Sequence, residues 1–168
     1  MPATKNGKMS AKVYLLLGSN MNNPELQLQK AKAEISQSIG EIIESSSCYA
    51  TAPWGNANQS HFINQVVKLN TTLNPLETMQ TILSIEEKLG RIRTEKNAPR
   101  AIDIDILFFD KEIVDVPNLQ IPHPHIQDRN FVLIPLNEIA PSFVHPVLQK
   151  NIHELMKACK DKLAVDKI

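Results

Sequence analysis

Two aspartates lie two residues apart within an apolar stretch of the chain, APRAIDIDILFFD. Because side chains alternate along a strand, Asp103 and Asp105 are expected on one side, roughly 6–7 Å apart, with the isoleucines facing the core. The same alternation predicts Leu107 and Phe109 on the aspartate side and Phe108 on the isoleucine side. Repulsion of about 2–3 kcal/mol, at an effective dielectric constant of roughly 20, favours a cation between the carboxylates.

A hard divalent cation suits such a pair. Mg²⁺ needs few protein carboxylates and completes its octahedron with water and phosphate oxygens, so two neighbouring aspartates can hold nucleotide-bound ions. The alternative is that both aspartates are solvated on an exposed strand face.

A third carboxylate, Glu86, is expected on the apolar side of a helix. With residues at 100° intervals, Glu86 falls near the middle of the apolar stripe, whereas Glu87 and Lys88 point outward. An inward carboxylate needs a hydrogen-bond partner or a polar pocket. The alternative is that Glu86 reaches solvent because the helix is ending. The stripe consists of Leu76, Met79, Ile82, Leu83, Ile85 and Leu89.

The loop GRIRTEKNAPR, immediately before the two aspartates, supplies Arg91, Arg93, Lys96 and Arg100. Metal-bound carboxylates can hold one side of a polyphosphate while guanidinium groups bind the other side. The loop therefore indicates phosphate chemistry, with a solvated charged loop as the alternative.

A strand over FINQVV places Phe62 and Asn64 on one face, where a ring and an amide could stack and read a flat heterocycle. Ordinary core packing is the alternative. Further along, HPHIQDRNF supplies His123, His125, Arg129 and Phe131. This spacing favours phosphate or structural contacts over a zinc site.

The composition indicates one globular domain. The chain has 168 residues, and its 18 Lys and Arg balance its 18 Asp and Glu, so it lacks the overall basic field that attracts nucleic acid or an anionic membrane. Residues 1–10 are expected to be a flexible extension and residues 11–168 a single domain. The start does not resemble a secretory signal, so a cytoplasmic location is expected. Cys48 and Cys159 are expected to be free thiols.

The elements are expected in the order βαββαβ, which is typical of an α+β ferredoxin-like sandwich with an antiparallel sheet. Helices would cover one face and leave the opposite face free. After Asp110 the signals weaken into Pro-rich C-terminal additions, with short helices over 131–139 and 151–160. The predicted strands are 12–20, 41–51, 61–72 and 101–109, and the helices are 23–40 and 74–90.

Six blocks in this order resemble the 6-hydroxymethyl-7,8-dihydropterin pyrophosphokinase family. They are LGSN (17–20), YATAPWG (49–55), FINQVV (62–67), IEEKLGRIR (85–93), PRAIDIDIL (99–107) and IPHPHIQDRNFVLIPLNEIAP (121–141). The resemblance implies a Mg²⁺-dependent, folate-pathway enzyme that transfers diphosphate from ATP to the pterin hydroxymethyl group and releases AMP. It spans about 12–146.

The resemblance also implies residue roles. Asp103 and Asp105 would bind two Mg²⁺ ions and, with Arg91 and Arg100, form the catalytic set. The pterin would be bound by Thr51, Trp54, Phe62, Asn64 and Phe131. ATP would be bound by Glu86, Arg93, Arg100, Ile106, His123 and Arg129. Of these, Arg93, Arg100, His123 and Arg129, together with Arg91, match positions of polyphosphate-binding or loop-closing cations in the family. The partners are then ATP and the pterin, without nucleic acid or membrane, and the chain is expected to be a monomer.

The sequence departs from the family at the basic loop, which is short and reads APR where GPR and a preceding tryptophan are frequent. Two other interpretations stay open from the residues. One is a nucleotidyltransferase, which also combines a Gly-Ser turn with a D-x-D strand, although here GSN lies more than eighty residues before DID, too far for one strand-turn-strand unit. The other is a non-catalytic nucleotide-binding module on the same scaffold.

Overall fold

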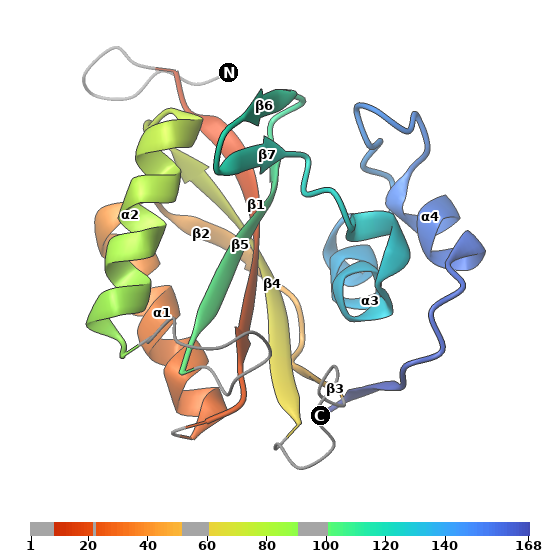
Figure 1. The fold of residues 1–168 in the computed structure, drawn as a ribbon, viewed down its shortest axis with the longest axis horizontal. Coiled ribbons are helices and arrows are strands. Elements are labelled where there is room, and N and C mark those ends of the chain that lie inside the picture. Colours follow the sequence, from red (N-terminus) through yellow and green to blue (C-terminus); the bar gives the residue numbers. More distant parts are fainter. Residues whose placement is uncertain (1–8, 22, 52–60, 91–100) are drawn as a thin grey trace.

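The computed structural model describes residues 9–21, 23–51, 61–90 and 101–168. Their main sheet is antiparallel, with strand order β5-β1-β4-β3-β8 and β2 also paired with β4 (Figure 1). This confirms the expected ferredoxin-like sandwich. The strands are β1 (Ala11–Ser19), β2 (Ile42–Ser45), β3 (Tyr49–Thr51), β4 (Phe62–Thr71), β5 (Asp103–Phe109), β6 (Val114–Val116), β7 (Leu119–Ile121) and β8 (Val165–Lys167). The helices are α1 (Pro24–Ser38), α2 (Pro75–Lys88), a short 3-10 turn (Ile126–Asp128), α3 (Asn130–Ile139) and α4 (Ile152–Ala158).

The first two helices begin and end where the sequence predicts. Asn23 caps α1 and Asn74 caps α2, and each cap is followed by proline at the first helical position. In α2, Asn74 and Glu77 form a reciprocal capping box. Gly90, with φ of 97°, follows the end of α2 in the left-handed conformation that glycine tolerates. Both helices pack on one face of the sheet over a continuous apolar core.

The opposite face of the sheet is not free, so that expectation was wrong. A second core forms there between the sheet and the α3–α4 layer, which lies on the other side of the sheet from α1 and α2 (Figure 1). Its sheet side includes Leu16, Val66 and Phe108, which are apolar and must be kept from water. The short C-terminal helices supply that cover.

Three local features differ from the predicted strands. The single strand expected over 41–51 is two strands, β2 and β3, which both pair with β4 on either side of Ser46. The β5–β1 register shifts between Tyr14 and Leu15, so Leu107 has no partner across the ladder. Phe108 therefore belongs to the second core and Phe109 to the first, the reverse of the predicted sides. The hairpin β6–β7 and the strand β8 were not predicted.

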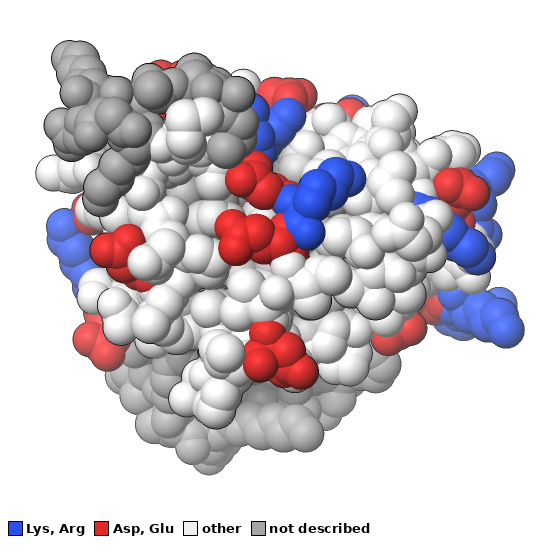
Figure 2. Space-filling view, turned by 90° about the horizontal axis from the view of Figure 1, so that it is seen from above, with Lys and Arg blue, Asp and Glu red and all other residues white. Residues whose placement is uncertain are grey.

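Acidic and basic side chains are mixed on one face of the molecule, where they are interspersed among uncharged atoms (Figure 2). In the described part of the chain, each helix is too short or too polar to span a bilayer.

Among the glycines in the described ranges, Gly40 has the closest backbone neighbour. A Cβ at this position would lie 1.7 Å from the backbone oxygen of Asn70. We expect Gly40→Ala to lower the free energy of unfolding by about 3 kcal/mol, because backbone rather than a flexible side chain would have to move. Urea denaturation checks this. The control is Ser38→Ala, at the exposed last residue of α1, two residues before Gly40. Equal midpoints for the two variants would contradict the prediction.

His145 should make stability depend on pH. Its Nδ1 accepts hydrogen bonds from the backbone N–H of Val147 and Leu148, both at 3.1 Å, so this nitrogen carries no proton. Burial and the charge of Lys111 lower the pKa of His145 below its usual 6.5. The folded state therefore binds fewer protons than the unfolded state once the pH falls below about 6.5.

We expect the free energy of unfolding to fall as the pH is lowered from 7 through 6.5 toward the folded pKa of His145. His145→Asn keeps an oxygen acceptor that does not titrate here and should flatten this fall. Burial lowers the pKa of His123 to about 4, which gives a slope of the same sign. The free energy of unfolding of the parent and of the variant is measured by urea denaturation from pH 8 to 5. The difference between the two curves gives the contribution of His145 alone. Parallel curves would exclude its contribution.

Candidate active site

Cross-strand register gathers the predicted site residues on one face of the sheet. Gly18 of β1 lies opposite Asn64 of β4 on one side and Asp103 of β5 on the other. In the next row on this face, Leu16 lies between Val66 and Asp105. The face that carries the second core therefore also carries both aspartates and Asn64, at the end of the sheet where apolar residues give way to polar ones.

The absence of a side chain at Gly18 leaves space for the Asn64 amide. A Cβ on Gly18 would lie 2.7 Å from Asn64 Oδ1, so only glycine leaves this amide where it is. Asn64 is buried, and its Nδ2 donates to Thr51 Oγ1 at 3.3 Å. Strand β1 therefore leaves room for the Asn64 amide, and strand β3 accepts its hydrogen bond.

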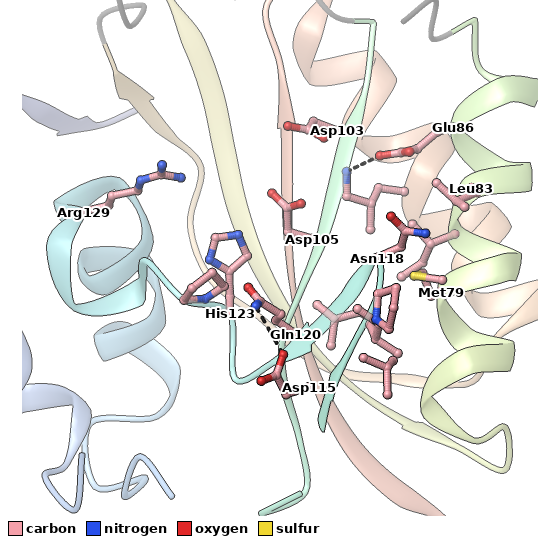
Figure 3. A pocket seen from close by; sticks show the side chains of 17 residues that line it. Met79, Leu83, Glu86, Asp103, Asp105, Asp115, Asn118, Gln120, His123 and Arg129 are labelled. Atoms are coloured by element: carbon pink, nitrogen blue, oxygen red, sulfur yellow. Dashed lines mark hydrogen bonds between the residues drawn. The ribbon is translucent and has the colours of Figure 1, made fainter. Parts of the chain in front are cut away.

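Asp103 and Asp105 project from β5 to the same side, as predicted from strand alternation (Figure 3). Both are partly exposed, and β5 is an edge strand of the sheet. Within the ranges that the structure covers, three or more His, Cys, Asp or Glu are nowhere grouped to hold a metal ion. Two carboxylates still fit Mg²⁺, since water and phosphate oxygens supply its remaining ligands.

Glu86 confirms the prediction of an inward carboxylate with a partner. It is 2% exposed, and its Oε2 accepts a hydrogen bond of 2.8 Å from the backbone N–H of Ile104 (Figure 3). Because antiparallel backbone groups alternate in direction, this N–H points away from β1, toward the free edge of β5. Glu86 thus satisfies a backbone donor that the sheet leaves unpaired.

A cleft of about 790 Å³ runs along this edge. That volume falls within the roughly 300–1,000 Å³ of small-molecule sites. Its walls come from α2, β5, the β6–β7 hairpin and the segment leading to α3 (Figure 3). Six residues predicted from the sequence line it, namely Glu86, Asp103, Asp105, Ile106, His123 and Arg129.

His123 enters this cleft as a neutral imidazole. Burial lowers its pKa to about 4, with the nearby charges of Arg129 and His125 acting in the same direction. Its Nδ1 accepts from the backbone N–H of His125 at 3.1 Å, so the ring proton is on Nε2. The family resemblance implied a cation at this position, whereas the chain without ligand presents a neutral donor at pH 7.

The predicted pterin residues lie beside the cleft. Thr51 is buried and Phe62 is half-buried, and the two are opposite each other on β3 and β4. Phe131 opens α3, and its ring centroid lies 5.7 Å from the guanidinium carbon of Arg129. Trp54 lies outside the described residues, as do Arg91, Arg93, Lys96 and Arg100.

Sequence reasoning missed one wall of the cleft. Asp115, Asn118 and Gln120 of the β6–β7 hairpin line it, with Met79 and Leu83 of α2 opposite. Leu83 is 39% exposed despite its predicted place in the apolar stripe. The pattern IVDV-PN-LQI contained a usable signal, because proline followed by asparagine in a left-handed conformation is typical of a type II turn.

Comparisons with known proteins identify the family and the fold of this chain. Residues 14–141 match the family described as 7,8-dihydro-6-hydroxymethylpterin-pyrophosphokinase (HPPK). The chain is 38% identical over 153 residues to a 2-amino-4-hydroxy-6-hydroxymethyldihydropteridine pyrophosphokinase of Pseudomonas aeruginosa, covering 90% of this chain and 93% of that relative. It is 40% identical over 149 residues to the protein of the same name from Haemophilus influenzae, covering 88% and 92%.

Among solved structures, the Plasmodium falciparum HPPK-DHPS wild type with pteroate superposes with a TM-score of 0.73 at 19% identity. The match covers 89% of this chain but 42% of that chain, and at this identity it shows the fold alone. The family match and the two bacterial relatives each cover most of the chain, and so this chain belongs to the 7,8-dihydro-6-hydroxymethylpterin-pyrophosphokinase family.

Proposed function

We propose that the cleft along β5 is where this chain transfers diphosphate from ATP to the hydroxymethyl group of 6-hydroxymethyl-7,8-dihydropterin, with release of AMP. The observation that carries the proposal is the row of Asn64, Gly18 and Asp103 across three strands. It brings an amide suited to a heterocycle edge next to two carboxylates suited to nucleotide-bound cations. The reaction needs both recognition elements side by side.

The pterin would bind at the β4 side of this row. Asn64 has an amide that can both donate to and accept from the pterin edge, and its contact with Thr51 fixes the direction in which it points. Phe62 and Phe131 supply ring faces for stacking on the flat heterocycle. Trp54, from outside the described residues, would complete this pocket.

ATP would bind along the free edge of β5. Glu86 and Ile106 line the cleft there, as do residues of the β6–β7 hairpin. Arg129 and the Nε2 donor of His123 are on the other side, where phosphate oxygens would be. The predicted cations Arg91, Arg93 and Arg100 precede β5 directly in sequence and would neutralise the remaining phosphate charge.

Asp103 and Asp105 would hold Mg²⁺, and we propose two ions. The metal supplies charge neutralisation for the triphosphate and makes the substrate hydroxyl more acidic. This donor set is hard oxygen on a partly exposed edge, which suits Mg²⁺ rather than a soft-metal site.

The chain's own contribution is positioning. The hydroxymethyl oxygen forms a bond to the β-phosphorus, the bond from that phosphorus to the α,β-bridging oxygen breaks, and the hydroxyl proton is lost to solvent. Stacking rings and Asn64 would hold the attacking oxygen in line, and the guanidinium groups would stabilise the charge that moves to AMP. A strong protein base is not required.

We also propose that residues 11–168 form one catalytic domain, that the chain acts as a monomer and that it works in the cytoplasm. A cleft of small-molecule size, lined by residues of this range, supports the assignment of a catalytic domain.

Asp103→Asn and Asp105→Asn should each lower turnover on the order of 10²-fold or more, because a carboxylate ligand is lost where charge must be stabilised. The unfolding midpoint should change little, since each substitution also removes repulsion between like charges. Phosphorus NMR of ATP, Mg²⁺ and the hydroxymethyldihydropterin follows AMP and pterin diphosphate. Asp166→Asn, on strand β8 at the opposite edge of the sheet, is the control.

Near-parental AMP production by both variants would refute the metal assignment. AMP attached to an acceptor would instead indicate a nucleotidyltransferase. Binding of ATP without its Mg²⁺-dependent consumption would indicate a nucleotide-binding module.

Glu86→Ala should lower the free energy of unfolding by about 1–3 kcal/mol, because the buried N–H of Ile104 loses its acceptor. It should also weaken the binding of Mg²⁺ and a non-hydrolysable ATP analogue, since the edge of β5 forms the nucleotide wall. Urea denaturation and calorimetry measure the two effects. Glu87→Ala, one residue further on the exposed side of α2, should change neither. Parental stability of Glu86→Ala would show that this hydrogen bond contributes nothing.

A further inference from the structure

Glu138, near the end of α3, joins that helix to the sheet through both of its carboxylate oxygens. Oε1 accepts a hydrogen bond from the hydroxyl of Tyr49 at 2.5 Å. Oε2 accepts from the backbone N–H and from the hydroxyl of Ser47, each at 3.0 Å. The Glu138 side chain therefore ties both β3 and Ser47, two residues before Tyr49, to α3.

The sheet side of this contact belongs to the pterin wall. Tyr49 lies directly opposite Asn64 in the β3–β4 ladder. Thr51 lies two residues after Tyr49 and so points to the same face, where it accepts the hydrogen bond from Asn64. Movement of Tyr49 away from α3 would therefore move Thr51 and loosen the direction of the Asn64 amide.

On the helix side, Glu138 lies in the same helix, α3, as the proposed stacking ring of Phe131. Phe131 lies seven residues before Glu138 in α3, which is close to two helical turns, so the two side chains leave the same side of the helix. Glu138 thus sets the position of the helix that carries Phe131 relative to the strand that carries Thr51. These are the two walls between which the pterin would bind.

We propose that Glu138 is a positioning residue for the pterin pocket, which it shapes by holding the Phe131 helix at a fixed distance from Thr51 and Asn64. The inference rests on the proposed function, because it takes Thr51, Asn64 and Phe131 to be the residues that contact the pterin. Glu138 itself touches neither substrate.

The ionisation states suit this role. Glu138 is largely exposed, and although partial desolvation raises its pKa, the hydrogen bonds from Tyr49 and Ser47 outweigh that effect and lower the pKa, so the carboxylate is charged at pH 7. Burial and the same carboxylate raise the pKa of Tyr49 to about 12, so the phenol keeps the proton that it donates. Lys167 of β8, opposite Tyr49, adds a favourable charge.

The test compares Glu138→Gln, Tyr49→Phe and the double variant in the full chain. The dissociation constant of 6-hydroxymethyl-7,8-dihydropterin is measured by calorimetry with Mg²⁺ and a non-hydrolysable ATP analogue present. The dissociation constant of the analogue alone is measured in parallel. Each single variant should weaken pterin binding roughly tenfold, the order of effect expected from losing one hydrogen bond to a charged group. Binding of the nucleotide analogue should stay at the parental value, and KM for pterin should rise more than kcat falls.

The double variant should bind pterin no more weakly than the weaker single variant, because both changes break the same contact. Glu34→Gln is the matched control. Its carboxylate also accepts through both oxygens, from Lys88 at 3.0 and 2.9 Å, but it ties α1 to α2 on the other side of the sheet. This control should leave both dissociation constants unchanged.

Parental pterin affinity in both single variants would overturn the inference, as would equal weakening of pterin and nucleotide binding. If Glu138→Gln does not fold, Tyr49→Phe alone decides, since it removes the hydrogen bond between β3 and Glu138 without altering α3. A parent chain that binds the nucleotide but not the pterin refutes the proposed function, and the inference with it. A parent that forms pterin diphosphate while the variants bind pterin normally refutes the inference alone.

Discussion

The antiparallel pairing of β5 with β1 is the constraint on which the site depends. It places Ile104 and Ile106 in the core beneath α2 and leaves Asp103 and Asp105 on the opposite face. Because the side-chain period of a strand is two, a slip by one residue would bury both carboxylates and expose the isoleucines. Folding energy and site geometry therefore favour the same register. The charges that oppose folding elsewhere in a sheet are tolerated here because β5 is at the edge and its end is open to solvent.

That edge position also explains why Glu86 is buried. The sheet leaves the outward N–H of Ile104 without a strand partner, and an exposed edge donor invites pairing with other chains. Glu86 satisfies this donor from α2 and at the same time brings a carboxylate into the wall of the cleft. A single residue thus links the stability of the edge to the polarity of the site. Gly18 has a comparable role on the neighbouring strand β1, where the absence of a side chain gives Asn64 its place.

Local signals in the sequence were sufficient for the first half of the fold. Asn and Pro at the helix starts, Gly after the helix ends and alternation along the strands each act within a few residues, so α1, α2 and the aspartate face could be predicted. The features that were missed depend on distant partners. The bulge at Leu107 accompanies the packing of Phe108 against α3 and α4, and the cover on the second face comes from segments whose own patterns are weak. Likewise, the family resemblance assigned a charge to His123, but only the surrounding fold shows that burial keeps the ring neutral.

The second core has a role in the site beyond burying apolar area. Its helices are short, and α4 has only 7 residues, so they contribute little intrinsic helical stability and are held by tertiary contacts. Asp161 accepts from the backbone N–H of Asn130 at the start of α3, while Glu138 binds Tyr49 and Ser47 near its end. Polar contacts at both ends add to the close packing of the second core in holding the helix in place. Since Phe131 and Arg129 lie at the start of this helix, the same contacts determine where a ring face and a guanidinium meet the cleft.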